Sequence, residues 1–180
     1  SNATVVSGTY DASTLTFKAD VDLSSGQYFT ISGSFLAPTG IHSVVSGSWN
    51  NAATWDCSCV PTLTDSVFIE PTHTVSVDAD AFTYDLYVEL GATLQMAADF
   101  DLDILGDFMI DGALDFSDGR LALIGESIQF VNANGNIVNL NELLIESPNE
   151  SSILFMNGEY ILNNTLHPNV SASLTVLDTQ

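Results

Sequence analysis

The sequence predicts an all-β fold, a right-handed parallel β-helix, on three observations. Helical periodicity of apolar residues is almost absent. Short apolar segments recur from residue 82 onward at a spacing near 20 residues, and glycine recurs in register with them at Gly91, Gly112 and Gly135. Several short strands in a period of roughly 20–25 residues are typical of stacked coils, each of which buries its apolar side only against its neighbours.

Five pairs of alternating apolar residues mark the predicted coils. Their first members are 16, 19, 22 and 17 residues apart, and the pairs are Leu86/Val88, Leu102/Ile104, Leu121/Leu123, Leu143/Ile145 and Tyr160/Leu162. Asparagine clusters between residues 132 and 141, and it tolerates the left-handed backbone that tight corners require. We therefore place the coils in residues 82–180. An antiparallel β-sandwich is the alternative, but short strands with glycines in register favour the β-helix.

Two segments precede these coils. Residues 41–81 form a capping head that contains both tryptophans, with short strands predicted at 65–69 and 73–78. Residues 1–40 alternate in strand fashion on both sides of a polar break at 24–27. They are predicted to form a β-hairpin or a cap, or the tail of an upstream module. The opening Ser1-Asn2-Ala3 resembles the remnant of a cleaved tag, so we expect a longer natural chain.

The head resembles the opening of large bacterial cell-surface proteins. The matching residues are Ser46-Gly47-Ser48-Trp49, Thr54-Trp55, Cys57, Val60-Pro61, Asp65-Ser66-Val67-Phe68-Ile69 and Val75-Ser76-Val77-Asp78, followed by repeats at 86–94 and 106–114. The head is also similar to the eight-glycine domain of some animal extracellular proteins, although several of its glycines are missing. The resemblance covers roughly residues 44–146. It implies export, surface attachment and a role in adhesion or carbohydrate contact, with no catalytic residues.

The charge balance excludes several classes of partner. The chain carries 23 acidic residues against Lys18 and Arg120, which gives a formal charge of −21. Such a surface repels phosphate and anionic lipid headgroups, so we expect neither a nucleic-acid partner nor membrane insertion. Acidic polysaccharides are disfavoured unless a cation bridges them. No apolar run approaches the roughly 20 residues that span a bilayer. The abundance of Ser, Thr and Asn favours a secreted or cell-surface protein.

An enzyme of the polysaccharide lyase or hydrolase type is disfavoured. A lyase that removes a proton beside a carboxylate needs a cationic base or charge neutraliser, and Arg120 is the only Lys or Arg in the predicted coils. A hydrolase needs clustered carboxylates, a nearby histidine and a basic substrate clamp, and we find no sequence motif that supplies them. A β-helix alone carries no activity.

A calcium site is one interpretation of Asp99, Asp101 and Asp103. Alternation places these three carboxylates on one face of a strand, with Phe100 and Leu102 facing the core. Calcium takes several oxygen ligands, but carboxylates in line on one strand rarely enclose an ion. We therefore favour a solvated outer face, and no cofactor is required.

Four aromatic residues, Trp49, Trp55, Tyr84 and Tyr87, form a candidate sugar-stacking platform. For the tryptophans we favour a different role. The open end of a β-helix exposes core and strand edges, so a cap is physically required there. We expect Trp49 and Trp55 to supply it.

Cys57 and Cys59 are separated only by Ser58. A C-x-C pair in extended backbone lies near the upper limit of Cα separation for a disulfide. A local disulfide, two free thiols and pairing with other parts of the protein all remain open. Zinc is disfavoured, because the sequence has no second cysteine pair.

Two functions follow from the sequence. The first is a non-catalytic, adhesive or structural segment of an exported surface protein, which contacts glycans or other surface proteins. The second is a carbohydrate-active enzyme or its accessory domain. A groove lined by clustered aspartates and aromatic residues would favour the second function, and a featureless acidic outer face would favour the first.

Overall fold

The computed structural model describes residues 9–11, 16–18, 40–97, 99–146, 152–168 and 173–177. The chain divides into two compact units, Ser1–Leu36 and Ala37–Gln180. In the first unit, β1 (Thr9–Asp11) pairs antiparallel with β2 (Thr16–Lys18). Residues 1–40 therefore contain a short hairpin, whereas the turn predicted at 24–27 lies outside the described residues.

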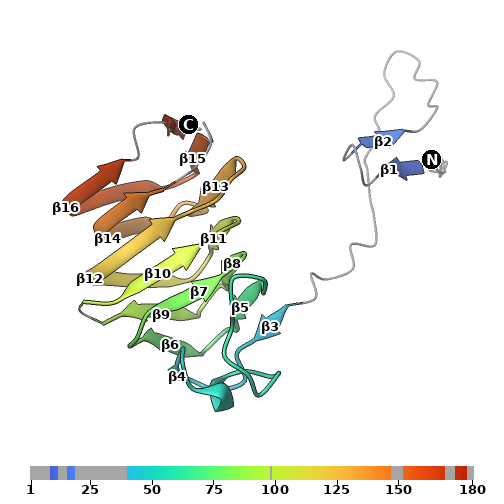
Figure 1. Ribbon diagram of the computed structural model, residues 1–180, viewed down its shortest axis with the longest axis vertical. Coiled ribbons are helices and arrows are strands. Elements are labelled where there is room, and N and C mark those ends of the chain that lie inside the picture. The colour runs from blue at the N-terminus through green and yellow to red at the C-terminus, as the bar shows by residue number, and fades with distance from the viewer. Residues whose placement is uncertain are drawn as a thin grey trace, which may run out of the picture. The chain divides into compact units, whose positions relative to one another are not determined.

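The second unit is a right-handed parallel β-helix of about five turns (Figure 1). Its named strands pair in parallel throughout, which rules out the antiparallel sandwich. A single 3₁₀ turn, η1 (Ala52–Thr54), is the only helix in the described part of the chain. Nothing within that part forms a helix long and apolar enough to cross a membrane.

The coils contribute strands to three faces. One sheet contains β3 (Ile41–His42), β5 (Val67–Ile69), β8 (Leu86–Val88), β11 (Phe108–Ile110), β13 (Gln129–Asn132), β15 (Ser152–Met156) and β17 (Ser173–Leu177). A second contains β4 (Gly47–Ser48), β6 (Thr74–Val77), β9 (Thr93–Met96), β12 (Ala113–Leu123), β14 (Ile137–Ile145) and β16 (Glu159–Pro168). The strands β12, β14 and β16 run on past a corner and stack on β7 (Ala81–Thr83) and β10 (Asp101–Ile104). We call this third face, residues 81–83, 101–104, 120–123, 142–145 and 165–168, the β10 face.

Strand alternation builds the core. In β6 and β10 the side chains alternate between half-buried and buried positions, so Val75, Val77, Leu102 and Ile104 point inward. Equivalent inward residues of successive coils stack on one another, as in the buried ladder Val67, Leu86, Phe108, Val131 and Phe155. Stacking therefore turns one or two apolar residues per strand into a continuous core.

The β-helix begins before the predicted boundary at residue 82. The strands β3 and β5 pair in register and continue into β8, and β4 and β6 continue into β9. Residues 41–81 are thus the first coils rather than a separate head. The long strand-free stretch between Ser48 and Val67 hides this register in the sequence. Trp49 and Trp55 lie inside this end, only 0% and 1% exposed, and meet edge to face with ring centroids 5.1 Å apart.

Coil corners explain the recurring glycines. Gly91 and Gly135 have φ of +86° and +88°, a left-handed conformation that favours glycine. Gly112 is required for space instead, because a Cβ there would collide with the carbonyl oxygen of Glu89 and lie 2.6 Å from that of Ala92. The same residue type therefore recurs for two different physical reasons.

Candidate functional site

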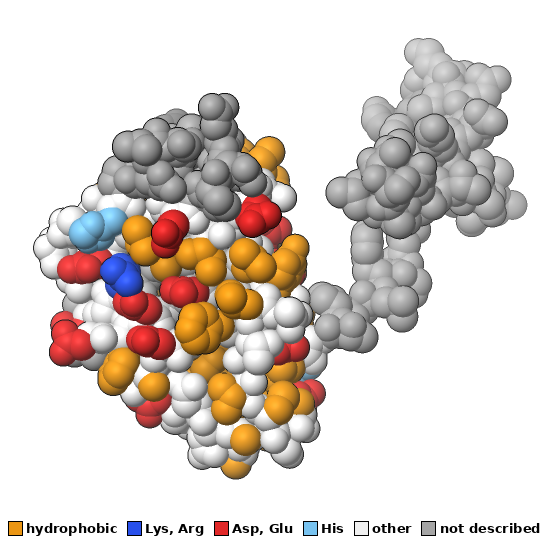
Figure 2. Space-filling model, in the orientation of Figure 1, with side chains coloured by type: hydrophobic (Ala, Val, Ile, Leu, Met, Phe, Trp, Pro, Cys, Tyr) orange, Lys and Arg blue, Asp and Glu red, His pale blue; other side chains and the backbone are white. Residues whose placement is uncertain are grey.

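The β10 face aligns residues that are far apart in the sequence. One outward ladder contains Phe82, Asp103, Ala122, Leu144 and His167, and the next contains Asp101, Arg120, Glu142 and Thr165. In Figure 2, acidic side chains (red) surround the Lys or Arg side chain that is drawn in blue, and a band of hydrophobic side chains (orange) lies beside them. This face therefore combines carboxylates, a guanidinium and apolar surface within a few coils.

Local sequence positions Arg120 opposite Asp101. In β10, Leu102 and Ile104 are buried, so Asp101 and Asp103 point outward as alternation predicted. The bend within β12 passes through Gly119, whose φ is +71° and whose added Cβ would lie 2.7 Å from the carbonyl oxygen of Phe100. Glycine at this bend lets Arg120 resume the register and pair with Asp101.

A polar hollow of about 280 Å³ surrounds this pair. Its lining residues are Asp99, Phe100, Asp101, Gly119, Arg120, Asn141 and Glu142. The Nη2 atom of Arg120 forms an ion pair with Oδ2 of Asp101, and both side chains are about one-third exposed. Glu142 accepts a hydrogen bond from Nδ2 of Asn164 at 3.1 Å. The hollow thus presents partly solvated donors and acceptors, which suit the hydroxyl groups of a polar ligand.

Two exposed aromatic rings lie on or next to the β10 face. Phe82 is 39% exposed and stands next to Asp103 in register, and Tyr84 is 45% exposed two residues further along, just past the end of β7. Gly106 leaves room for this corner, since a Cβ there would collide with the carboxylate of Asp85 and lie 3.0 Å from the Tyr84 carbonyl oxygen. An exposed ring beside hydrogen-bonding groups is a common element of ligand-binding surfaces.

Asp103 is a carboxyl group of the β10 face, and its surroundings shift its pKa. Partial burial raises its pKa above the ordinary value, and the charge of Asp101 raises it further. The Arg120 guanidinium lowers this pKa in part, while Asp80 and Glu146 add to the upward shift. Asp103 therefore retains its proton to a higher pH than an isolated aspartic acid does.

The raised pKa of Asp103 predicts how stability varies with pH. A carboxyl group whose pKa is higher in the folded than in the unfolded state binds its proton more tightly in the folded state. Its contribution to the free energy of unfolding is therefore greatest below the unfolded pKa and is lost as pH rises through the folded pKa. Asp103→Asn should therefore raise stability at pH 7, by less than about 1 kcal/mol for so solvated a group. It should also reduce the loss of stability between about pH 4, near the unfolded pKa of an aspartic acid, and pH 7. Melting temperatures from circular dichroism at both pH values measure this.

The matched control for that prediction is Asp115→Asn, which also removes one negative charge, from an exposed side chain of β12. If Asp115→Asn raises the melting temperature at pH 7 as much as Asp103→Asn does, the effect is general relief of charge repulsion and the assignment to Asp103 is wrong.

The four aromatic residues considered as a candidate platform are not brought together. Trp49 and Trp55 lie in the first coil and are buried. Tyr87 stacks on Phe68 on the first sheet, with ring centroids 4.4 Å apart and planes 4° apart, and Phe68 stacks in turn on His42. Tyr84 lies at the corner before β8, close to the β10 face. The rings of Tyr84 and Tyr87 are apart because residue 84 lies in the corner between β7 and β8, whereas residue 87 lies in β8 on the first sheet.

The candidate calcium ligands, for which a solvated outer face was favoured, do not converge either. Asp99 precedes β10 at a residue with φ of +66°, while Asp101 is paired with Arg120. Over the described ranges, no group of three or more His, Cys, Asp or Glu side chains is placed to hold a metal ion. The calcium interpretation of Asp99, Asp101 and Asp103 therefore has no support in this geometry.

The structure joins Cys57 and Cys59 in a disulfide, which selects one of the three alternatives left open by the sequence. Their Cα atoms are 5.1 Å apart, well inside the range for a disulfide. Ser58 between them has φ of +53°, and this turn shortens the span that an extended C-x-C would have. Sequence alone could not show this turn.

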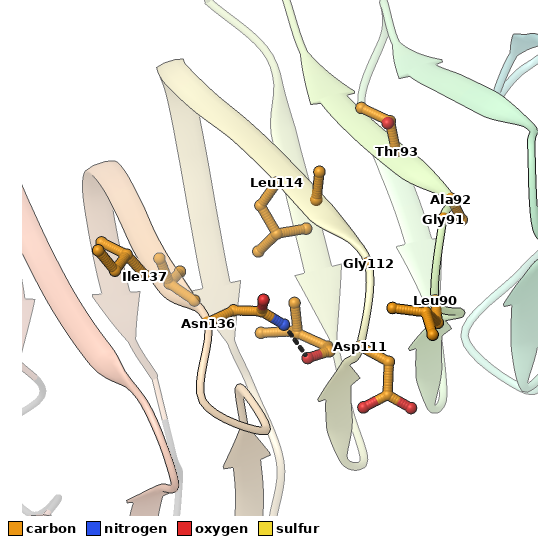
Figure 3. Close-up of a pocket in the computed structure, with 12 residues that line it drawn as sticks. Leu90, Gly91, Ala92, Thr93, Asp111, Gly112, Leu114, Asn136 and Ile137 are labelled. Atoms are coloured by element: carbon orange, nitrogen blue, oxygen red, sulfur yellow. Dashed lines mark hydrogen bonds between the residues drawn. The ribbon is translucent and has the colours of Figure 1, made fainter.

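A second hollow, of about 380 Å³, lies at a coil corner (Figure 3). It forms because the corner at Asp111 and Gly112 has two residues, whereas the corners on either side, 89–92 and 133–136, have four. Its polar side chains are already engaged. Nδ2 of Asn136 donates to the Ile110 carbonyl at 3.0 Å, and Oδ1 of Asp111 accepts from Asn134. The polar side chains of the hollow at Arg120 also have partners within the chain, but that hollow contains a guanidinium, which this corner does not.

Comparison with protein-family models, with curated proteins and with solved structures finds no match for this chain. The geometry of the β10 face is therefore the basis for a functional proposal. From the sequence, Asp101 and Asp103 were considered together with Asp99, Arg120 was considered apart from them, and Glu142 and Phe82 were missed. The only signal for their proximity is the register between coils.

Proposed function

We propose that this chain is a non-catalytic module of an exported surface protein, and that its β10 face contacts neutral glycans. The observation that carries the proposal is the polar hollow at Arg120 together with two exposed rings outside its lining, Phe82 opposite Asp103 and Tyr84 two residues further along the chain. A pyranose has an apolar face and a rim of hydroxyl groups. Rings and charged hydrogen-bonding groups on one surface match both parts.

Charge narrows the class of glycan. The formal charge of −21 repels uronate- and sulfate-bearing polysaccharides. Arg120 offers no free positive charge to offset this, because it is paired with Asp101. Uncharged sugars avoid the repulsion and still accept hydrogen bonds from the guanidinium and donate them to the carboxylates. Neutral glycans are therefore the ligand class that the proposal names.

Two further observations support an exported, structural setting. Disulfides such as Cys57–Cys59 persist in oxidising compartments outside the cytosol. Stacked coils also hold the β10 face on hydrogen-bonded strands rather than on loops, so little ordering entropy is lost when a ligand binds. A stiff coil that presents a binding face suits an adhesive or spacing role at a surface.

Removing both rings tests the proposed glycan surface. The double variant Phe82→Ala/Tyr84→Ala should weaken binding to immobilised neutral oligosaccharides about tenfold, which corresponds to roughly 1.4 kcal/mol. Leu90→Ala removes an exposed apolar side chain from a corner on another side of the coil and should leave binding unchanged. A glycan array followed by titration calorimetry measures both variants. Equal losses in the two variants, or no binding by the wild type, would contradict the proposal.

A glycoside hydrolase acting on the same face is the second candidate. The specific observation in its favour is Asp103, a carboxyl with a raised pKa beside Asp101, whose charge is paired with Arg120. Glycosidases use two neighbouring carboxyl groups, of which the general acid has a raised pKa. Release of reducing sugar ends by the wild type, lost in Asp103→Asn, would replace the binding proposal with this one.

A further inference from the structure

The disulfide lies on an exposed loop of the first coil. Residues 56–60 are all exposed, and this includes Cys57 and Cys59. Exposed disulfides are the ones that thiols reach, and they are more labile than buried structural bridges. Accessibility is therefore the first condition for exchange with a thiol, and this disulfide meets it.

The fold holds this loop in place without the disulfide. Trp55 on one side of the loop and Pro61 on the other are buried. The Asp56 N–H donates to the His42 carbonyl at 2.9 Å, and the Ser58 N–H donates to the Trp55 carbonyl at 3.0 Å. The carboxylate of Asp56 also accepts the His42 N–H at 3.1 Å. The loop ends are thus fixed by packing and hydrogen bonds.

The disulfide and the fold therefore stabilise each other only weakly. A bridge stabilises a protein more when the loop that it closes is longer, and this bridge closes a loop of only three residues. By thermodynamic linkage, a bridge that adds little to folding gains little protection from folding. Reduction of Cys57–Cys59 should therefore leave the β-helix intact.

Backbone contacts distinguish the two sulfur atoms. The Cys59 N–H donates to Sγ of Cys57 at 3.1 Å, and the Cys59 carbonyl oxygen lies further from the same atom, at 3.5 Å. A donor at this position stabilises negative charge on Sγ of Cys57 and makes it the better leaving thiolate. An incoming thiolate should therefore attack Sγ of Cys59.

We propose that Cys57–Cys59 is a thiol-exchange site through which this chain forms a covalent bond with a thiol on a positively charged segment of a partner protein. The partner thiolate attacks Sγ of Cys59, the S–S bond breaks, and its electron pair leaves on Sγ of Cys57, which takes a proton from water. The product is a mixed disulfide at Cys59 and a thiol at Cys57. Attack by the Cys57 thiolate on Cys59 reverses the step and releases the partner as a thiol, so no external oxidant is needed.

Charge determines which thiols react fastest. The chain carries −21, and Asp56 is the immediate neighbour of Cys57. This field raises the local concentration of cationic thiols and lowers that of anionic ones, and added salt screens the difference. A thiol within a basic segment should therefore react faster than a small anionic thiol.

The exchange is measured on the full oxidised chain with three thiols at equal thiolate concentration: a lysine-rich peptide with one cysteine, cysteamine and glutathione. Acid quenching traps the mixed disulfide, and peptide mapping by mass spectrometry locates it.

At low salt we expect the lysine-rich peptide to react fastest, cysteamine next and glutathione slowest. The rates of the peptide and glutathione should differ at least tenfold, and this difference should shrink in 0.5 M salt. The adduct should lie on Cys59. An adduct chiefly on Cys57, or glutathione reacting as fast as the peptide at low salt, overturns the proposal.

Two variants keep the test independent of folding. Cys57→Ser/Cys59→Ser should form no adduct and should change the melting temperature by about 4 °C or less. A larger fall would show that the bridge is a structural staple and would overturn the premise of easy exchange. Asp56→Asn should increase the glutathione rate more than the cysteamine rate, and an equal change in both rates would contradict the electrostatic argument.

Discussion

Replacing Trp55 with alanine is expected to lower the free energy of unfolding by about 3–5 kcal/mol, the range for truncation of a large buried aromatic residue. Trp55 is 1% exposed, packs edge to face on Trp49 and donates from Nε1 to the Trp49 carbonyl at 2.7 Å. Its loss leaves a cavity in the first coil and an unpaired buried carbonyl. Urea unfolding followed by far-ultraviolet circular dichroism measures the change.

Two other substitutions make this result interpretable. Trp55→Phe retains the aromatic contact but loses the hydrogen bond, so it should cost about 1–2 kcal/mol. Tyr84→Ala removes an exposed ring and should stay within about 1 kcal/mol of the wild type. A Trp55→Ala variant as stable as Tyr84→Ala would show that the tryptophans do not close this end of the β-helix.

Gln129→Leu is expected to destabilise the protein by about 3 kcal/mol. The side chain is 1% exposed and links three backbone groups at one corner. Its Nε2 donates to the carbonyls of Ile104 and Gly106, at 3.0 and 2.6 Å, and its Oε1 accepts the Gly125 N–H at 2.8 Å. Leucine has a similar volume but leaves these groups unpaired, and each buried polar group without a partner costs about 1–3 kcal/mol.

The same substitution on the outer side of a strand is the control for Gln129. Gln95 is exposed in β9 and accepts only a 3.2 Å hydrogen bond from Ser76 Oγ. Gln95→Leu should change stability by about 0.5 kcal/mol or less. Thermal and urea unfolding of both variants test the comparison. Equal effects would mean that the corner at Gln129 does not depend on its hydrogen bonds.

The sequence predicted the architecture because the glycines recur at successive corners and lie within one residue of register. Leu94 and Leu114 are partners in adjacent coils and lie three residues after Gly91 and two residues after Gly112, respectively. The apolar pairs were a poorer guide, since Leu86 lies on the first sheet and Leu102 on the β10 face. Every face alternates in the same way, so alternation alone cannot show which face a strand joins.

Variable coil length is the physical reason why the site was harder to predict than the fold. Along the ladder Val67, Leu86, Phe108, Val131 and Phe155, successive coils advance by 19, 22, 23 and 24 residues. Corners absorb these differences, so no fixed period places Arg120 opposite Asp101. The outward direction of Asp101 and Asp103 was predictable, because it follows from alternation within one strand.

Some of the acidic residues prove to have a role that composition did not suggest. The carboxylate of Asp85 accepts the Asp107 N–H at 2.8 Å, and that of Asp107 accepts the Phe130 N–H at 2.9 Å. These carboxylates accept hydrogen bonds from backbone N–H groups of the following coil, at a corner where the hydrogen bonding between strands is interrupted. Burial raises the pKa of Asp107, an effect that the hydrogen bond from Phe130 partly offsets. Corner carboxylates are thus structural acceptors as well as surface charges.

Chemical-shift mapping by nuclear magnetic resonance with a neutral oligosaccharide shows whether the β10 face binds a glycan without cleaving it. We expect perturbed amide signals at residues 82–84, 101–103 and 119–124, few at the opposite corner around Leu90, and an oligosaccharide recovered intact after days. Perturbations centred away from the β10 face, or cleavage of the oligosaccharide by the wild type, would contradict a non-catalytic glycan-binding module.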